Sequence, residues 1–184
     1  ERPSLDRPTR SGVLGLLAAA LGIRRHEEAA LNGLGESLGL AVRVDSPGRR
    51  LRDYHTVQVA KEPKRGAWYA RRADELAADP DWISTILSRR EYLQDAFFTA
   101  CLWKRGPDEP PTLADMAGAL ERPRLTPCLG RKACPPALPF HPALGPHESP
   151  LDALEAYAVD AHLTMLGRTP QEKTVVFLDD EEME

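Results

Sequence analysis

The sequence predicts an α+β fold built on an antiparallel sheet, and three observations lead to this prediction. Helical signals come first, over residues 9–38. Segments with alternating or β-branched residues follow at 40–58 and 83–103, and a last one lies at 173–178. Helices and strands grouped in separate runs are typical of a mixed arrangement with antiparallel pairing. With 184 residues and 42% hydrophobic content, the chain is long enough for one domain with its own core.

The first two elements are predicted to be helices. Thr9 or Ser11 can accept the hydrogen bond that caps a helix start, and a run rich in leucine and alanine follows. Gly22 is expected to end this helix, because glycine adopts the left-handed conformation of a helix C-terminus at little cost. A second helix is expected from about residue 27 to 38, with Gly39 as its end.

The strand predictions rest on patterns of period two. Residues 40–45 and 51–58 alternate and are separated by a Ser-Pro-Gly turn. Residues 59–82 show no steady period, so we expect an inserted loop or hairpin that projects from the core. The remaining expected elements are two strands over 83–103, a helix over 113–120 capped by Thr112, a short helix over 151–157 and the final strand at 173–178.

Composition excludes several classes of protein. No apolar run approaches the ~20 residues that cross a bilayer, and the sequence opens without a secretory signal, so we expect a cytoplasmic protein with no membrane partner. The three cysteines are an odd number, which argues against a disulfide framework. Their spacing does not suit zinc, so we predict no metal and no cofactor.

The charge is distributed unevenly. The net charge is −4, but the segment 179–184 alone holds five acids, and we expect it to be a mobile acidic tail. Residues 43–72 hold nine Lys or Arg against three acids, and residues 122–132 hold four against none. Local patches of this kind decide whether a protein binds a polyanion. For any single patch, an ordinary solvated surface is the alternative interpretation.

The most informative segment is the loop Thr126-Pro-Cys-Leu-Gly-Arg-Lys-Ala-Cys-Pro-Pro136. Gly130 lets the backbone approach a ligand closely, and the prolines reduce the entropy that the loop loses on binding. Arg131 offers a forked donor and Lys132 a point charge, both suited to phosphate. We interpret the loop as a rigid basic contact to a nucleic-acid backbone. A proline-rich surface turn with incidental charge is the alternative.

Two further segments offer RNA contacts. Arg10, Ser11 and Gly12 lie at the start of the first helix, where free N–H groups and the helix dipole favour an anion, and an ordinary N-cap is the alternative interpretation. Tyr54 and His55 are neighbours on a strand, so they face opposite ways. We expect one to face the core and the other to face the open side of the sheet, where it can stack on a base.

Four blocks of sequence occur in an order that points to one family. They lie at residues 7–22, 51–57, 90–96 and 123–135. Together they resemble the CasD family, the RAMP subunits that cap the crRNA handle in type I-E CRISPR Cascade. The resemblance implies a ferredoxin-like (RRM-type) palm in a single domain over 1–184, with an inserted β-hairpin thumb at about 59–90. We expect that the strand that precedes the first helix in that family is missing from this sequence.

The resemblance also implies a function. The protein would be a non-catalytic subunit that binds the 5′ handle of a crRNA. It would contact a CasC-type backbone subunit and the PAM-reading large subunit, and it would meet target DNA only indirectly. The predicted RNA-binding residues are Arg10, Ser11, Gly12, Tyr54, His55, Arg90, Arg124, Gly130, Arg131 and Lys132, with thumb contacts from Lys61, Lys64 and Arg65.

Two alternatives remain open. A related branch of the family cleaves pre-crRNA without metal, and Tyr54, His55 and Lys132 could supply the base and the cation that this reaction needs. A generic RRM-like protein unrelated to CRISPR is the other alternative. The sequence resembles the non-cutting branch, so we predict no catalytic residue.

Overall fold

The computed structural model describes residues 4–61, 70–77, 79–165, 167 and 175–178. Contacts between Cα atoms divide the chain into two compact units. The larger unit comprises residues 5–47 and 95–184, and the smaller unit comprises residues 1–4 and 48–94.

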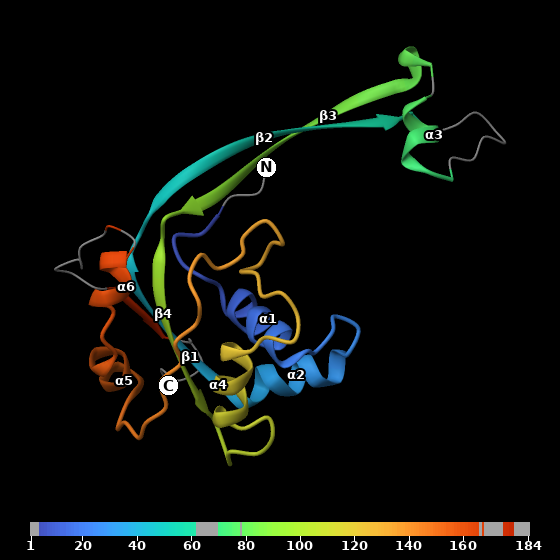
Figure 1. Ribbon diagram of the computed structural model, residues 1–184. Coiled ribbons are helices and arrows are strands. Elements are labelled where there is room, and N and C mark those ends of the chain that lie inside the picture. The colour runs from blue at the N-terminus through green and yellow to red at the C-terminus, as the bar shows by residue number, and fades with distance from the viewer. Residues whose placement is uncertain (1–3, 62–69, 78, 166, 168–174, 179–184) are drawn as a thin grey trace. The chain divides into compact units, whose positions relative to one another are not determined.

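The larger unit combines helices with a three-stranded sheet (Figure 1). Its elements are α1 (Arg10–Leu21), α2 (Glu28–Ser37), β1 (Leu38–Ser46), β4 (Phe97–Lys104), α4 (Leu113–Glu121), α5 (Pro150–Ala156), α6 (Asp160–Met165) and β5 (Val175–Leu178). The strands pair antiparallel in the order β4–β1–β5. The predicted mixed α+β class with an antiparallel sheet is therefore confirmed, whereas the ferredoxin-like arrangement stays a prediction.

The core of the larger unit lies between the sheet and three helices. Leu17 of α1 packs with buried residues of α2 and α4, and Val13, one turn earlier, packs against Leu40 and Val42 of β1. Because Leu40 and Val42 are two residues apart, they share one face of the sheet. Figure 1 shows α1, α2 and α4 on this side of β1 and β4, with α5 and α6 on the other side.

The opposite face of β1 carries a buried ion pair. Arg43 Nε lies 2.6 Å from Asp45 Oδ1, and the two side chains are only 11% and 3% exposed. The hydroxyl of Thr99 donates to Asp45 Oδ2 at 2.6 Å, and Arg43 donates to the backbone carbonyls of Leu154 and Tyr157. This network attaches α5 to the sheet and satisfies the charges that β1 brings into the interior.

The second helix ends earlier than predicted. It stops at Ser37, and Gly39 lies within β1 opposite Trp103 of β4 instead of ending the helix. A Cβ at Gly39 would lie 2.1 Å from the indole ring of Trp103. Glycine is needed here because the ring packs directly on the backbone of the strand. This contact between distant residues cannot be recognised from the local sequence that suggested a helix end.

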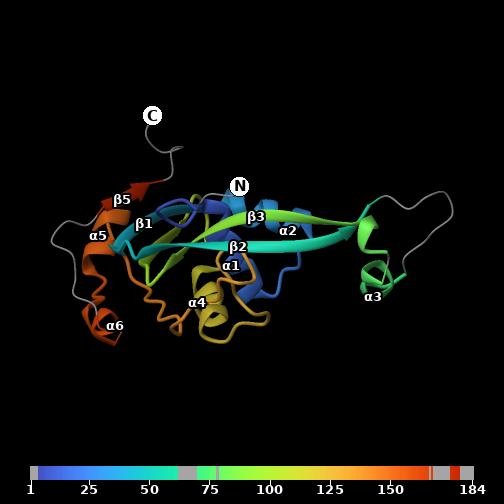
Figure 2. The same ribbon diagram turned by 90° about the horizontal axis from the view of Figure 1, so that it is seen from above.

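The smaller unit is a long two-stranded hairpin. Its strands are β2 (Arg49–Ala60) and β3 (Ile83–Gln94), paired antiparallel, and the connection between them contains α3 (Arg72–Leu76) and a 3₁₀ turn, η1 (Pro80–Trp82). Both strands are seen along their length in Figure 2. The hairpin begins at Arg49 and ends at Gln94, so it is longer at both ends than the insertion expected over residues 59–82. The thumb at 59–90 and the single domain over 1–184 stay predictions.

The expectation that Tyr54 or His55 faces a core is wrong. The two residues do lie on opposite faces of β2, but Tyr54 is 56% exposed and the side chain of His55 is 35% exposed. A two-stranded sheet has no buried face of its own, so alternation along β2 does not separate inside from outside. The elements α3, η1 and α6 were not predicted, because each is too short for a helical period to show in the sequence.

Candidate nucleic-acid interface

The start of α1 is capped as the sequence predicts. Thr9 is the N-cap, and its hydroxyl accepts a hydrogen bond from the backbone N–H of Gly12 at 3.1 Å. Ser11 is exposed, with its hydroxyl 3.2 Å from that of Thr9. Gly12 is buried beneath this turn. The first turn therefore presents hydroxyl groups and the positive end of the helix dipole at one place.

Arg10 has a structural partner at this helix start. Its Nη2 donates to the carbonyl of Leu38 at 2.7 Å and to the carbonyl of Gly35. These carbonyls lie at the end of α2, where the last turn of a helix lacks intrahelical donors and a cation is favoured. The side chain thus joins the ends of two helices, and its contact with RNA stays a prediction.

The basic loop runs along α1 in the direction opposite to the helix. The backbone N–H of Arg124 donates to Ala20 at 3.0 Å, and that of Leu125 donates to Ala19 at 3.1 Å. Four residues later, the side chain of Leu129 packs into the cluster formed by Val13 and β1. The loop therefore begins at the last turn of α1 and reaches its first turn at Leu129.

A tight turn follows Leu129. The N–H of Leu129 donates to the carbonyl of Cys134 at 2.9 Å, and the N–H of Cys134 donates to Arg131 at 2.9 Å. Gly130 has φ of +75°, where residues with a Cβ are strained, and no atom lies near the position of its missing Cβ. Glycine is thus required here for backbone conformation, while the space beside it stays open.

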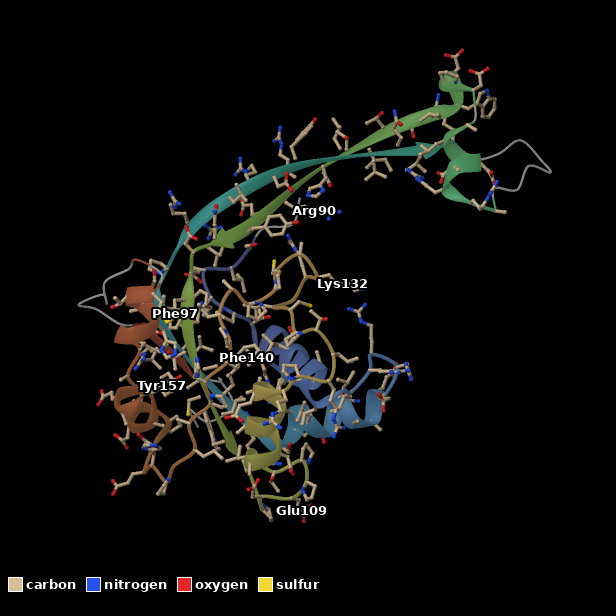
Figure 3. All side chains as sticks on the ribbon, in the orientation of Figure 1. Arg90, Phe97, Glu109, Lys132, Phe140 and Tyr157 are labelled. Atoms are coloured by element: carbon tan, nitrogen blue, oxygen red, sulfur yellow. The ribbon has the colours of Figure 1, made fainter. Side chains whose placement is uncertain are left out.

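The turn places the two predicted phosphate ligands beside the start of α1. Arg131 is half-buried and Lys132 is exposed, and Figure 3 labels Lys132 on this loop. A Cβ on Gly12 would lie 3.5 Å from Leu129 Cδ1, so the turn and the first turn of the helix are in direct contact. Residues 10–12 and 130–132, which the sequence indicated separately, are therefore brought together. We call this surface the α1–turn surface, defined by residues 9–12 and 129–132.

Arg124 lies at the other end of α1. Its Nη1 donates to the carbonyl of Leu21 at 3.3 Å, and its side chain covers Gly22, whose φ is +86°. A helix of twelve residues is about 18 Å long, so the structure does not bring Arg124 together with the turn. Its guanidinium stabilises the carbonyl end of α1, and a role in RNA binding stays a prediction.

The hairpin holds the other predicted contacts. Tyr54 lies opposite Arg89 and shares its face of the sheet, whereas Asp53 lies opposite Arg90 on the other face, which also carries His55. His55 Nε2 is 2.6 Å from Asp53 Oδ2. Each face thus offers an aromatic ring beside an arginine, an arrangement suited to a base and its phosphate.

Other charged side chains of the hairpin form ion pairs with one another. Glu91 pairs with Arg50 and Arg52, both at 3.1 Å. The hydrogen bond from Arg52 lowers the pKa of the Glu91 carboxyl, and partial burial opposes this shift. Lys61 donates to the carbonyl of Asp81 at 2.9 Å and remains exposed. The other predicted thumb contacts, Lys64 and Arg65, lie outside the described residues.

The three proposed nuclease residues come from both compact units. Tyr54 and His55 point to opposite faces of β2, so a single bound phosphodiester cannot meet both directly. Lys132 belongs to the other compact unit. Within the described part of the chain, no group of three or more His, Cys, Asp or Glu residues could hold a metal ion. Among the same residues, no helix is long and apolar enough to cross a bilayer.

Sequence reasoning missed one cation near the helix start. Arg7 lies over the ring of Phe177 in β5, with its guanidinium carbon 3.8 Å from the ring centroid. The two residues are 170 positions apart, so no local pattern could have paired them. The buried pair of Arg43 and Asp45 was likewise missed, although two charges within an alternating strand are a usable signal.

The sequence model of the family described as CRISPR-associated protein (Cas_Cas5) matches residues 1–183. A curated relative, the CRISPR system Cascade subunit CasD of Escherichia coli strain K12, is 43% identical over 142 residues, which cover 73% of this chain and 57% of the relative. The chain thus spans little more than half the length of this relative.

Two solved structures are also similar. One, titled "Crystal structure of Cas protein", has a TM-score of 0.59 and 30% identity, with 98% of this chain and 70% of that chain covered. The other, titled "CRISPR RNA-guided surveillance complex", has a TM-score of 0.49 and 36% identity, with 74% and 52% covered. With a family match along almost its whole length, the chain belongs to the Cas5 family of CRISPR-associated proteins.

Proposed function

We propose that the chain is a non-catalytic crRNA-binding subunit of a type I-E CRISPR surveillance complex. In this role it binds the 5′ handle of the crRNA and contacts a CasC-type backbone subunit and the PAM-reading large subunit in the cytoplasm. The chain contacts target DNA only indirectly, through these partners. The family assignment supports this proposal, as does 43% identity to a Cascade subunit.

One observation carries the residue assignment. The capped start of α1 and the turn at Gly130 are in contact through Gly12 and Leu129, so N–H groups, hydroxyls and cations converge on one surface. Backbone N–H groups at a helix start and flanking cations are the usual ligands of a phosphate. A single-stranded RNA end that runs along the α1–turn surface would place several of its phosphates against these groups in succession.

The hairpin is the second RNA contact in this proposal. Tyr54 and Arg89 on one face, and His55 and Arg90 on the other, can each stack on a base and hold its phosphate. Such contacts tolerate any sequence and weaken with salt. The acids beside these residues, Asp53 and Glu91, limit the net positive charge and favour stacking over purely ionic binding.

The experiment that tests this function is recovery of RNA from the complex purified from cells. The proposal predicts one RNA species with a constant 5′ end, and its loss from complexes whose chain carries both Arg131→Ala and Lys132→Ala. RNA with random ends would instead favour a generic RNA-binding protein. Cleavage of repeat RNA by the purified chain, abolished in His55→Ala, would replace the scaffold role with the nuclease role.

A further inference from the structure

A groove separates the two limbs of the segment that carries the turn at Gly130. Its lining comes from the last two residues of α4, from residues 123–127 before the turn and from residues 135–140 after it. The volume of the groove is about 390 Å³, which falls within the range of pockets that hold small ligands. We call it the proline groove. Figure 3 labels Phe140 of this groove and Lys132 of the turn.

The lining of the proline groove is apolar and rigid. Of the lining residues that the structure describes, only Glu121 and Thr126 are polar, whereas five are prolines and Phe140 adds an aromatic ring. Proline fixes its own φ, so the walls keep their shape without a ligand and lose little entropy when one binds. All of these residues are half-buried or exposed. The apolar surface of the groove is therefore available to a ligand.

Cations lie beside the groove on both of its limbs. The N–H of Leu129 donates to the carbonyl of Cys134 at 2.9 Å and closes the turn, so the two walls begin directly next to this hydrogen bond. Pro135 follows Lys132 by three residues, a span of at most ~11 Å. Arg122, in the other limb, is exposed. A phosphate on the turn and a base in the groove can thus belong to neighbouring nucleotides.

We propose that the proline groove binds one base of the RNA whose phosphates lie on the α1–turn surface. This inference rests on the proposed RNA-binding function. A base is a flat ring that can stack on the ring of Phe140, as bases do on aromatic side chains in other single-strand binding proteins. The flanking cations favour a nucleic acid over an apolar peptide as the occupant, because only the nucleic acid brings a phosphate for each base.

Glu121 gives the groove a means to distinguish bases. It is the last residue of α4 and is exposed, at the end of a helix where the dipole favours a cation, so its carboxylate is not explained by the stability of α4. A carboxylate only accepts hydrogen bonds. It therefore binds the amino group that cytosine carries at N4 and repels the O4 oxygen that uracil carries at the same place. Glu121 selects bases with an amino group against uracil.

The test measures binding of oligocytidylate and oligouridylate of equal length to the 184-residue chain. These probes have the same backbone and rings of similar size, so the ratio of their affinities reports the groups on the base. The variants are Glu121→Gln, Phe140→Ala and Phe140→Trp. Leu144→Ala is the control, because Leu144 is 60% exposed and lies outside the groove. Fluorescence anisotropy over a series of salt concentrations gives the affinities, and circular dichroism checks that each variant is folded.

The inference predicts that the wild-type chain binds oligocytidylate about tenfold more tightly than oligouridylate. Glu121→Gln should reduce this ratio to less than about twofold, because an amide both donates and accepts. Phe140→Ala should weaken binding of oligocytidylate about tenfold with no change in the salt dependence, since stacking releases no counterion. Phe140→Trp, which keeps an aromatic ring, and Leu144→Ala should each change affinity less than about twofold.

Different failures have different meanings. Equal affinity of the wild-type chain for the two probes, or a ratio unchanged in Glu121→Gln, would overturn the inference, and the second result does not depend on the folding of the Phe140 variants. Unchanged affinity in Phe140→Ala would overturn it as well. If that variant instead failed to join the complex purified from cells, the groove would be a protein contact. A wild-type chain that binds neither probe would refute the proposed function itself.

Discussion

The side chain of Leu129 lies against Gly12 at the first turn of α1. A Cβ on Gly12 would be 3.5 Å from Leu129 Cδ1 and 3.1 Å from the hydroxyl of the N-cap Thr9. The same glycine therefore allows both the helix cap and the approach of the cationic turn.

Replacing Gly12 by valine should separate the turn from the helix. The added methyl groups collide with Thr9 and Leu129, so we expect a loss of about 1–3 kcal/mol in the free energy of unfolding. The matched control is Gly15→Ala, because no atom lies within 4 Å of its missing Cβ and alanine favours a helix interior by about 0.5–1 kcal/mol. Urea denaturation of both variants measures the difference. Equal stability of the two would show that Leu129 does not pack here.

Removal of the cations on the turn should weaken RNA binding without unfolding the chain. The double change Arg131→Ala and Lys132→Ala should reduce the slope of log affinity against log salt by about 2, one unit for each lost phosphate contact. Arg25→Ala, an exposed arginine outside the α1–turn surface, is the control and should leave the slope nearly unchanged. An unaltered slope in the double variant would refute the site assignment.

Gly39→Ala should be among the most damaging small substitutions in the larger unit. Its Cβ would lie 2.1 Å from the ring of Trp103, so the indole must move and the β1–β4 pairing must adjust. We expect a loss of about 2–3 kcal/mol, as for other forced overpacking. Tryptophan fluorescence in a background of Trp68→Phe and Trp82→Phe provides a local measurement at Trp103. Gly118→Ala in α4, where no atom lies near the missing Cβ, should be neutral or stabilising.

Breaking the buried pair on β1 should also destabilise the larger unit. Asp45→Ala leaves Arg43 buried without its carboxylate, which costs about 3–5 kcal/mol in comparable cases. Thr99→Val removes only the hydroxyl that donates to Asp45 and should cost about 1 kcal/mol. Thermal unfolding of both variants checks the order. A larger loss from Thr99→Val than from Asp45→Ala would contradict the described network.

The hairpin should lose stability in acid through Glu91. Its pKa is lowered in the folded chain, chiefly by the hydrogen bond from Arg52. A group with a lowered folded pKa stabilises the fold above its unfolded value of about 4.3, and this contribution disappears as the pH falls through the folded pKa. Unfolding followed from pH 6 to pH 3 should therefore depend less on pH in Glu91→Gln. An unchanged profile would show that the ion pairs with Arg50 and Arg52 do not stabilise the hairpin.

Local chemistry made part of this fold predictable. Thr9 and Gly22 mark the bounds of α1 through interactions that residues close in sequence supply, and Thr9 is one of the two caps that the sequence offered. Thr112 likewise accepts the capping hydrogen bond of α4. The turn at Gly130 was recognisable because a glycine before two cations combines backbone freedom with charge.

Long-range packing accounts for what could not be predicted. Gly39 was assigned to a helix end because nothing near it in sequence reveals Trp103, 64 residues later. Tyr54 and His55 were expected to separate into a buried and an open residue, but β2 pairs with β3 in a sheet of two strands. Arg10 and Arg124 were assigned to RNA from local charge and the family resemblance, whereas the structure shows that each also donates to helix carbonyls.

Cross-linking of the bound RNA tests the central claim most directly. Ultraviolet irradiation of the complex purified from cells, followed by mass spectrometry of the peptides, locates the residues that touch the RNA. The account predicts cross-links from the 5′ end of the RNA to peptides that contain residues 9–12 and 129–132. Cross-links confined to other segments, with the turn at Gly130 protected by a neighbouring protein subunit, would contradict it.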